Sequence, residues 1–254
     1  MNLSLEFRNV VFLVSYPRSG NTWMRYLLTG IQYPEVELTY KNVEIYTLDL
    51  HQIGDLIRRN IFQSYSEAIN TSWRKSPCII KSHYRDFEPY NKVIYIYRDG
   101  RDVALSYWRF YCQQLKKEIT FDSFLDKFIA GDFGVAKGWK EHVESWVSGE
   151  FNRQDLIKLK VIKYEELFFN PFRILRDDVV EFLDLEVNDD VIKQTIKKAK
   201  YKNMCLDRAK VGQPIDMIGR YGKPGMWREK FNEDQLKKFR DYAGELMEQL
   251  GYEV

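Results

Sequence analysis

The segment with the clearest chemical potential is Tyr16–Trp23 (YPRSGNTW), which follows a short apolar run. A loop between a buried strand and a helix can bind phosphate, because free backbone N–H groups and the positive end of the helix dipole point there. Gly20 allows close approach or a positive φ, and Arg18 adds a fixed positive charge. The segment lacks the GxxxxGK[ST] pattern, so an ATPase would lack its usual lysine and magnesium ligand. From these residues alone, a phosphate loop and an ordinary turn capped by Asn21 or Thr22 are equal alternatives.

A second candidate segment is Tyr97–Tyr107 (YRDGRDVALSY). Arg98 would end a strand and Ser106 would lie about two turns into the following helix, so both could reach one anion if the chain folds back over the RDG turn. Alternatively, Arg101 and Asp102 form an ordinary solvated ion pair, with Asp102 as the N-cap of the helix. Taken by itself, the segment favours the structural alternative.

A third candidate is Lys81-Ser82-His83, at the end of the apolar segment CIIKS. Imidazole titrates near neutral pH, so His83 at a strand end beside Lys81 is a candidate general base. A purely structural histidine is the equal alternative. The chain has three histidines, and the other two, His51 and His142, fall inside predicted helices as surface or packing residues.

Each of these segments follows a run with the pattern of a buried strand. The predicted strands are Val10–Ser15, Cys78–Ser82, Val93–Tyr97 and Leu156–Lys163. The predicted helices are Thr22–Ile31, Asp102 to about Gln114, Phe121–Ile129, Val135–Val147, Phe172–Leu183, Val191–Lys200 and Glu233–Leu250. Short apolar strands that alternate with helices indicate right-handed crossovers. The predicted fold class is α/β: a three-layer parallel sheet with helices on both faces and a P-loop-like phosphate loop after its first strand.

The remaining long segment is Met204–Phe231, which contains four of the 14 glycines and two of the seven prolines. We predict a long functional loop there, because loops of this length in compact domains are usually binding lids or disordered. No repeat or linker divides the 254 residues, so a single domain over 1–254 is expected.

Composition excludes several classes of protein. Hydrophobic residues at 44% and charged residues at 30% indicate a folded chain, and a formal net charge of +2 does not support nucleic acid as a partner. The three cysteines lack the spacing of a disulfide framework or a zinc site, so no metal is predicted. We find neither a signal-peptide core nor an apolar stretch long enough for a membrane span, and we expect a cytoplasmic protein.

Together, the three segments resemble the sulfotransferase family that uses 3′-phosphoadenosine 5′-phosphosulfate (PAPS), with its cytosolic-type fold. YPRSGNTW follows the first predicted strand, KSH the second, and YIYRDGRDVALSY spans the third. Ile218–Trp227 (IGRYGKPGMW) looks like the family's RKGxxGxW segment, which closes over the 3′-phosphate. Ile162–Leu167 (IKYEEL) and Gly138–Trp146 (GWKEHVESW) also match, so the resemblance runs from about Val11 to the C-terminus with order and spacing kept.

The resemblance implies a role for each matching residue. It assigns to the 5′-phosphosulfate loop Arg18, Ser19, Gly20, Asn21 and Thr22, with Trp23 stacking on adenine. It assigns to the 3′-phosphate Arg98, Ser106, Arg220, Tyr221 and Gly222, and it places beside the adenine Tyr164 and Tyr201. His83 would take the proton of the acceptor, Lys81 would steady the sulfuryl group, and Arg18 would neutralise the leaving phosphate.

Three positions depart from the family's pattern. Arg18 replaces the lysine usual in YPKSGTTW, and a planar guanidinium does not copy the compact contact of an ammonium group. Tyr221 replaces the lysine of RKG, a charge that Lys223 could supply. Ala199 stands where a nucleotide-contacting threonine is common.

The sequence therefore predicts a PAPS-dependent O-sulfotransferase that acts on a small molecule or a saccharide and releases PAP. Two alternatives are a nucleotide-dependent phosphotransferase on a related fold and a non-catalytic nucleotide-binding module. The acceptor pocket is expected between 32–73 and 109–134, where an aromatic content of 15% mildly favours a ring-bearing acceptor. The sequence predicts neither the acceptor itself nor the oligomeric state.

Overall fold

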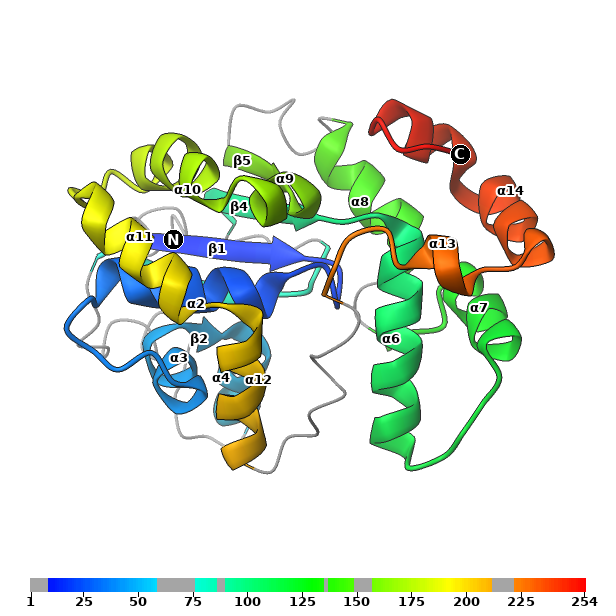
Figure 1. Ribbon diagram of the computed structural model, residues 1–254, viewed down its shortest axis with the longest axis horizontal. Coiled ribbons are helices and arrows are strands. Elements are labelled where there is room, and N and C mark those ends of the chain that lie inside the picture. Colours follow the sequence, from blue (N-terminus) through cyan, green and yellow to red (C-terminus); the bar gives the residue numbers. More distant parts are fainter. Residues whose placement is uncertain (1–8, 59–75, 86–89, 135–136, 149–156, 212–221) are drawn as a thin grey trace.

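The computed structural model describes residues 9–58, 76–85, 90–134, 137–148, 157–211 and 222–254. These residues form a parallel sheet in the order β2-β3-β1-β4-β5 (Figure 1). Its strands are β1 (Val10–Ser15), β2 (Leu48–Asp49), β3 (Cys78–Ser82), β4 (Lys92–Tyr97) and β5 (Lys158–Lys163). Every pairing is parallel, so the carboxyl ends of the strands meet at one edge of the sheet.

The position of β1 explains its apolar sequence. It lies between β3 and β4, and all six of its residues are buried. Successive strand side chains point to opposite faces, so Val11 and Leu13 enter one core cluster while Phe12 and Val14 enter another. A sheet buried on both faces has the continuous apolar pattern that this segment shows.

Helices cover both faces of the sheet. The helical segments are α2 (Asn21–Gln32), α3 (Tyr40–Tyr46), α4 (Leu50–Arg58), α6 (Gly100–Leu115), α7 (Phe121–Ala130), α8 (Trp139–Val147), α9 (Tyr164–Phe169), α10 (Pro171–Arg173), the π-helical turn η2 (Ile174–Val180), α11 (Asp189–Lys198), α12 (Tyr201–Lys210), α13 (Trp227–Lys230) and α14 (Glu233–Gln249). On one face, α2, η2 and α11 pack against β1 and its neighbours, and on the other α4 and α8 do so. The predicted α/β fold class is confirmed.

A further core cluster lies beyond the carboxyl ends of the strands. There α6, α7, α8, α13 and α14 pack around aromatic side chains, to the right of the arrowhead of β1 in Figure 1. Phe124, Phe128 and Trp139 are fully buried in this cluster. Of these helices, α6 lines the space above the strand ends.

Several boundaries differ from the sequence prediction. The strand expected at Val93 begins at Lys92, and the short strand β2 was not predicted. The helix expected over 135–147 is wrong at its start: Gly138 is the N-cap and Lys137 has a left-handed φ of 54°, which a helix does not permit. Residues 135–136 lie outside the described residues.

The loop predicted over Met204–Phe231 is wrong at both of its ends. Residues up to Lys210 belong to α12, and Trp227 to Lys230 form α13, while 212–221 lie outside the described residues. The N-cap alternative at Asp102 is also wrong, because the carboxylate of Asp99 accepts the N–H of Arg101 and caps α6. Among the described residues, no helix is long and apolar enough to cross a membrane.

Candidate functional site

The loop after β1 is shaped by two residues with positive φ. Arg18 has a φ of 73° and Gly20 a φ of 105°. A Cβ atom on Gly20 would lie 2.4 Å from Cδ2 of Tyr164, so only glycine fits under that ring. The loop then leads into α2 with its first N–H groups at the carboxyl edge of the sheet, which is the arrangement that favours an anion.

Polar side chains of this loop serve the fold as well as the cavity. The amide nitrogen of Asn21 donates to the carbonyl of Leu13 (3.2 Å) and to Oγ of Ser15 (3.2 Å), which ties the loop to β1. Its Oδ1 is buried, with no hydrogen-bond partner among the described residues. The hydroxyl of Ser19 is likewise buried, and Ser19 does not line the cavity described next.

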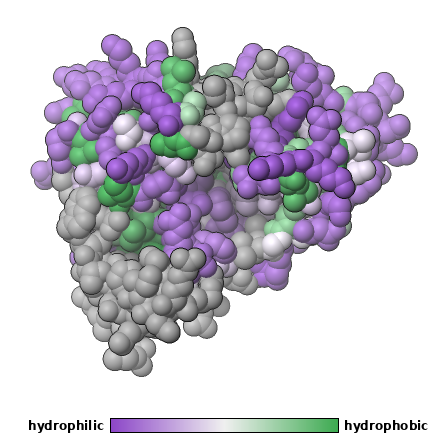
Figure 2. Space-filling view, turned by 90° about the horizontal axis from the view of Figure 1, so that it is seen from below, coloured by the Kyte–Doolittle hydropathy of each residue, from purple (hydrophilic) through white to green (hydrophobic). Residues whose placement is uncertain are grey.

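A cavity of about 670 Å³, hereafter the first cavity, opens above this loop. The face in Figure 2 is hollowed near its centre, where both hydrophilic and hydrophobic residues border a depression. One end of the cavity is aromatic: Trp23 meets Tyr164 edge to face, with ring centroids 5.9 Å apart, and donates its Nε1–H to the carbonyl of Ala199 (3.1 Å). Phe168 and Met204 complete this end, which suits a flat ring system.

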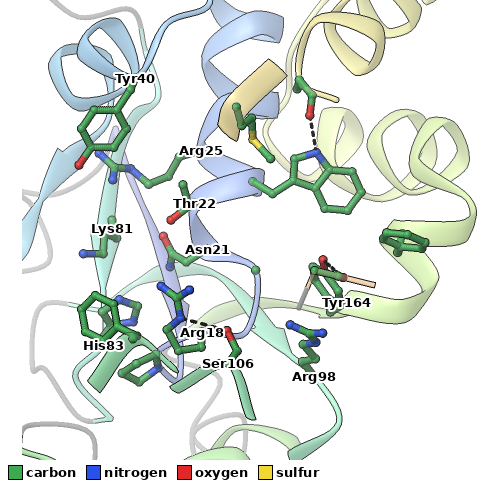
Figure 3. A pocket seen from close by; sticks show the side chains of 18 of the residues that line it. Arg18, Asn21, Thr22, Arg25, Tyr40, Lys81, His83, Arg98, Ser106 and Tyr164 are labelled. Carbon is green, nitrogen blue, oxygen red and sulfur yellow. Dashed lines mark hydrogen bonds between the residues drawn. The ribbon is translucent and has the colours of Figure 1, made fainter. Parts of the chain in front are cut away.

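Arg98 supplies positive charge beside that aromatic end, on the side away from Lys81 and His83 (Figure 3). Its guanidinium lies 4.6 Å over the ring of Tyr164, and Nη2 lies 3.5 Å from the buried carboxylate of Asp102. Asp102 also accepts the N–H groups of Gly225 (2.7 Å) and Trp227 (3.0 Å). Burial raises the pKa of Asp102, although Arg98 partly opposes that shift.

The segment that begins at Gly222, directly after the undescribed residues 212–221, thus forms part of the wall of the first cavity. Tyr164 donates its hydroxyl hydrogen to the carbonyl of Gly222 (2.6 Å), and Nη2 of Arg98 donates to the carbonyl of Lys223 (3.3 Å). Gly222 lines the cavity directly. Lys223 meets Arg98 through its backbone, so the proposed compensation by its ammonium group stays a prediction.

Arg18 lies nearer the centre of the cavity. Its Nε donates to Oγ of Ser106 (3.2 Å), and its guanidinium lies 5.0 Å from the ring centre of Phe110. Ser106 was expected to act together with Arg98, and both do line the first cavity. The hydrogen bond from Arg18 makes Ser106 a link between the loop after β1 and helix α6.

His83 has a defined tautomer. Its Nδ1 lies 2.7 Å from the carbonyl oxygen of Ser15, and since a carbonyl only accepts, Nδ1 carries the hydrogen and Nε2 keeps a free lone pair. Burial, together with the positive charge of Lys81, lowers the pKa of His83 to about 3. The imidazole is therefore neutral at physiological pH, the form that accepts a proton.

Lys81 forms an ion pair that the sequence did not predict. Its Nζ lies 2.6 Å from Oδ2 of Asp49, the second residue of β2. Burial alone would raise the pKa of Asp49, but the ammonium group of Lys81 holds it below its usual range. Figure 3 shows Lys81 and His83 on the same side of the cavity, facing Arg18.

A second cavity of about 540 Å³ adjoins the first. The two share wall residues, among them Asp49, Lys81 and His83, so these side chains lie at the junction between them. The walls that belong to the second cavity alone carry aromatic rings and a few polar groups: His51, Tyr84, Tyr111, Gln114, Asp132 and Phe133. Most of these belong to the segment over 109–134 that was expected to frame an acceptor pocket.

The comparison with protein families now decides the class of protein. A model of the sulfotransferase domain family matches residues 8–251. The chain belongs to the sulfotransferase family. The predicted family, the PAPS-dependent sulfotransferases, and the predicted class of enzyme are thereby confirmed.

Known sulfotransferases resemble the chain along most of its length. Sulfotransferase 1 family member D1 of Mus musculus is 25% identical over 272 residues, covering 94% of this chain and 86% of the relative. Flavonol 3-sulfotransferase of Flaveria bidentis is 24% identical over 262 residues, covering 91% and 79%.

Two solved structures show the same fold. A crystal structure of mouse sulfotransferase SULT7A1 complexed with PAP matches with a TM-score of 0.72 and 23% identity, covering 96% of this chain and 88% of that one. Retinol dehydratase in complex with androsterone and the inactive cofactor PAP matches with a TM-score of 0.68 and 18% identity, covering 97% and 83%.

Most of the predicted site residues of this sulfotransferase line the first cavity. They are Arg18, Gly20, Asn21, Thr22, Trp23, Lys81, His83, Arg98, Ser106, Tyr164 and Gly222. The side chain of Tyr201 and the residues Arg220 and Tyr221 lie outside the described residues, so their assignments stay predictions.

Sequence reasoning missed several groups of the sulfotransferase site. Asp49 lies on a strand of two residues, which is too short to show the sequence pattern of a strand. Glu44 lies on the short helix α3. Arg25 carried a weak signal: it is a charged residue in the middle of an apolar helix, and it is 3% exposed. A buried arginine requires charged or polar partners, which here are Glu44 and Thr47.

Proposed function

We propose that this sulfotransferase transfers the sulfuryl group of PAPS to a hydroxyl group of a small molecule or a saccharide, with His83 as the general base, and releases PAP. The observation that carries the proposal is the position of His83. His83, whose Nε2 is unprotonated, lines both a cavity with three arginines and an aromatic cavity. A base at that junction can serve an acceptor on one side and an activated donor on the other.

The residues of the first cavity fit a nucleotide with two separated phosphate groups. Arg98 beside Tyr164 would hold the 3′-phosphate, and Trp23 with Tyr164 would flank the adenine. The N–H groups at the start of α2, with Arg18, would hold the 5′ side. The solved structure of the mouse sulfotransferase contains PAP, which supports this choice of nucleotide.

The chain's own groups would then divide the chemistry between them. PAPS supplies an activated sulfuryl group, whose sulfur bonds to the acceptor oxygen as its bond to the phosphate oxygen breaks. Nε2 of His83 takes the proton of the acceptor hydroxyl. Arg18 neutralises charge on the leaving phosphate, and Lys81 stabilises the oxygens of the group in transfer. No group of three metal-binding side chains occurs among the described residues, and the mechanism is proposed without a metal.

The second cavity supports a ring-bearing acceptor. Tyr84, Tyr111 and Phe133 present aromatic surface there, and aromatic faces accommodate both phenols and the apolar faces of sugars. We further infer that residues 1–254 act as one domain. The cytoplasmic location and the absence of a nucleic-acid partner stay predictions.

Nucleotide selectivity and turnover test the proposal. Thermal unfolding should be measured with PAP, adenosine 5′-phosphosulfate (APS) and ATP at equal concentration, and PAP should stabilise the protein most because it alone has a 3′-phosphate. Turnover of PAPS should then be followed by mass spectrometry with 4-nitrophenol, a sterol, a simple glycoside and an aromatic amine. A preference for ATP would contradict the donor assignment. Preferential PAP binding without sulfation of any acceptor would favour the non-catalytic module.

A further inference from the structure

We propose that Asp49 is a positioning residue for sulfuryl transfer, which holds the ammonium group of Lys81 at the junction of the two cavities. This inference rests on the function proposed above for Lys81. No feature of the sequence distinguishes Asp49. It follows Thr47, the C-cap of the short helix α3, and Leu48.

The sheet itself places the two side chains together. In the parallel pairing of β2 with β3, Asp49 and Lys81 are register partners, so neighbouring positions on adjacent strands carry opposite charges. Nζ lies 2.6 Å from Oδ2, and the side chains are only 19% and 12% exposed. A pair that is this short and this sheltered from water is screened far less than a surface ion pair.

Asp49 is itself held from two directions. Its Oδ1 accepts the N–H of His51 (3.0 Å), so both carboxylate oxygens are engaged. Two residues earlier, Thr47 is fixed by Arg25, whose Nε donates to Oγ1 (2.7 Å) and whose Nη2 donates to the carbonyl (3.0 Å). Arg25 is anchored in turn by Glu44 at 2.7 Å. The strand that carries Asp49 is therefore pinned to α2, the helix that begins at the loop after β1.

The tether matters because lysine is flexible. An ammonium group on a four-carbon stem samples many positions, and it has three N–H donors. The hydrogen bond to Asp49 uses one donor and fixes Nζ, which leaves two donors for oxygens in the first cavity. Misplacing a reacting group by about 1 Å can cost about 10²-fold in rate, so loss of the tether should be felt in kcat.

A double-mutant cycle tests whether Asp49 acts through Lys81. The variants are Asp49→Asn, Lys81→Met and the combination, assayed with PAPS and 4-nitrophenol, with PAP affinity measured by calorimetry. We expect Asp49→Asn to lower kcat about 10- to 100-fold with little change in PAP affinity, and Asp49→Glu to recover part of the loss. In the Lys81→Met background the same Asp49→Asn change should cost less than about twofold, because residues that act as a unit are not additive.

The matched control is Asp184→Asn, which breaks an ion pair with Lys92 (3.2 Å) at the amino end of β4, where Asp184 is exposed, and should leave kcat unchanged. An equal loss from Asp49→Asn in both backgrounds would overturn the positioning role and would indicate direct contact of Asp49 with the acceptor. Normal turnover by Lys81→Met would overturn the proposed role of Lys81 and the inference with it. Loss of PAP affinity in Asp49→Asn would show that the pair holds the fold, and would also overturn the inference.

Discussion

The two cavities are built from different kinds of contact. The wall of the first cavity is held by polar contacts with backbone. Tyr164 donates to the carbonyl of Gly222, and behind the wall Asp102, the buried partner of Arg98, accepts the N–H groups of Gly225 and Trp227. The walls of the second cavity are mainly rings that touch other rings, such as Tyr111 beside Phe133 at 5.3 Å.

This difference has a physical consequence for selectivity. Buried polar networks have fixed partners and tolerate little change of shape, because an unmatched buried polar group is costly. Aromatic walls can repack around ligands of different outline at small cost. The first cavity should therefore accept one kind of nucleotide, whereas the second should accept a range of related acceptors.

The largest effect should come from replacing His83, which lines both cavities. His83→Ala should lower kcat about 10²- to 10⁴-fold, the usual contribution of a general base, while PAP affinity stays within a few-fold. His51→Ala is the matched variant, because it removes an imidazole from the wall of the second cavity only, and its kcat should fall far less. Near-normal turnover by His83→Ala would remove His83 from the mechanism.

The low pKa of His83 adds a pH prediction. In the unfolded chain this imidazole takes up a proton near pH 6.5, whereas in the folded protein it does so only near pH 3. The unfolded state therefore binds more protons between these values, and the free energy of unfolding falls as the pH is lowered through this range. The free energy of unfolding, measured by urea titration from pH 7 to pH 4, should decline less steeply for His83→Gln than for the natural chain. Equal slopes would contradict the buried, neutral imidazole.

The next largest effect concerns the first cavity alone. Arg98→Gln should weaken PAP about 10- to 100-fold, because a charge-assisted hydrogen bond contributes roughly 1.5 to 3 kcal/mol. Affinity for APS should hardly change, since APS has no 3′-phosphate. Arg18→Gln is the contrast: it should weaken PAP and APS by similar factors, because both carry a 5′ anion. Calorimetry at one salt concentration measures both affinities for the natural chain and for each variant. Equal loss of both nucleotides in Arg98→Gln would refute the 3′-phosphate assignment.

A smaller effect should follow from crowding the loop after β1. Gly20→Ala would place a Cβ 2.4 Å from Tyr164 at a φ of 105°, and should cost about 1 to 3 kcal/mol of stability together with part of the PAP affinity. Gly251→Ala is the control that separates backbone strain from the contact with Tyr164. Gly251 also has a positive φ, of 71°, but a Cβ there would lie 4.0 Å from its nearest neighbour, Nζ of Lys163. Chemical denaturation of both variants measures the difference. Equal losses would show that backbone strain, and not the contact with Tyr164, fixes the loop.

The smallest effect should come from the aromatic wall. Tyr111→Ala should raise KM for 4-nitrophenol about two- to tenfold, as expected when one aromatic contact worth about 0.5 to 1.5 kcal/mol is lost. PAP affinity should not change, because Tyr111 lines only the second cavity. A change in PAP affinity that matches the change in KM would show that the two cavities are not independent.

The sequence predicted the first cavity better than the junction, for a physical reason. Val10–Ser15 has a continuous apolar pattern because it is buried on both faces, and the loop that follows such a strand must emerge at the carboxyl edge. Arg98 follows another strand of this kind. The register between adjacent strands carries no comparable local signal, so the pairing of Asp49 with Lys81 could not be predicted.

The sequence also contains two candidate N-cap residues for helix α6. Asp99 and Asp102 are both acidic residues near the start of α6, and either could have capped it. Asp99 does so because its carboxylate also binds the guanidinium of Arg101, at 2.8 Å, whereas Asp102 is turned toward a segment more than 120 residues later. The choice between them depends on tertiary contacts that a single sequence does not display.

The contacts of Asp102 also bear on the order in which the molecule can be completed during synthesis. Gly225 lies 123 residues after Asp102, and Gly222 lies 58 residues after Tyr164. A ribosome that adds about 5 to 20 residues per second would release the sheet and α6 several seconds before the segment that joins the wall of the first cavity. The strands of the sheet can pair early, but the core cluster that contains α13 and α14 and the wall of the first cavity are completed only near the end of translation.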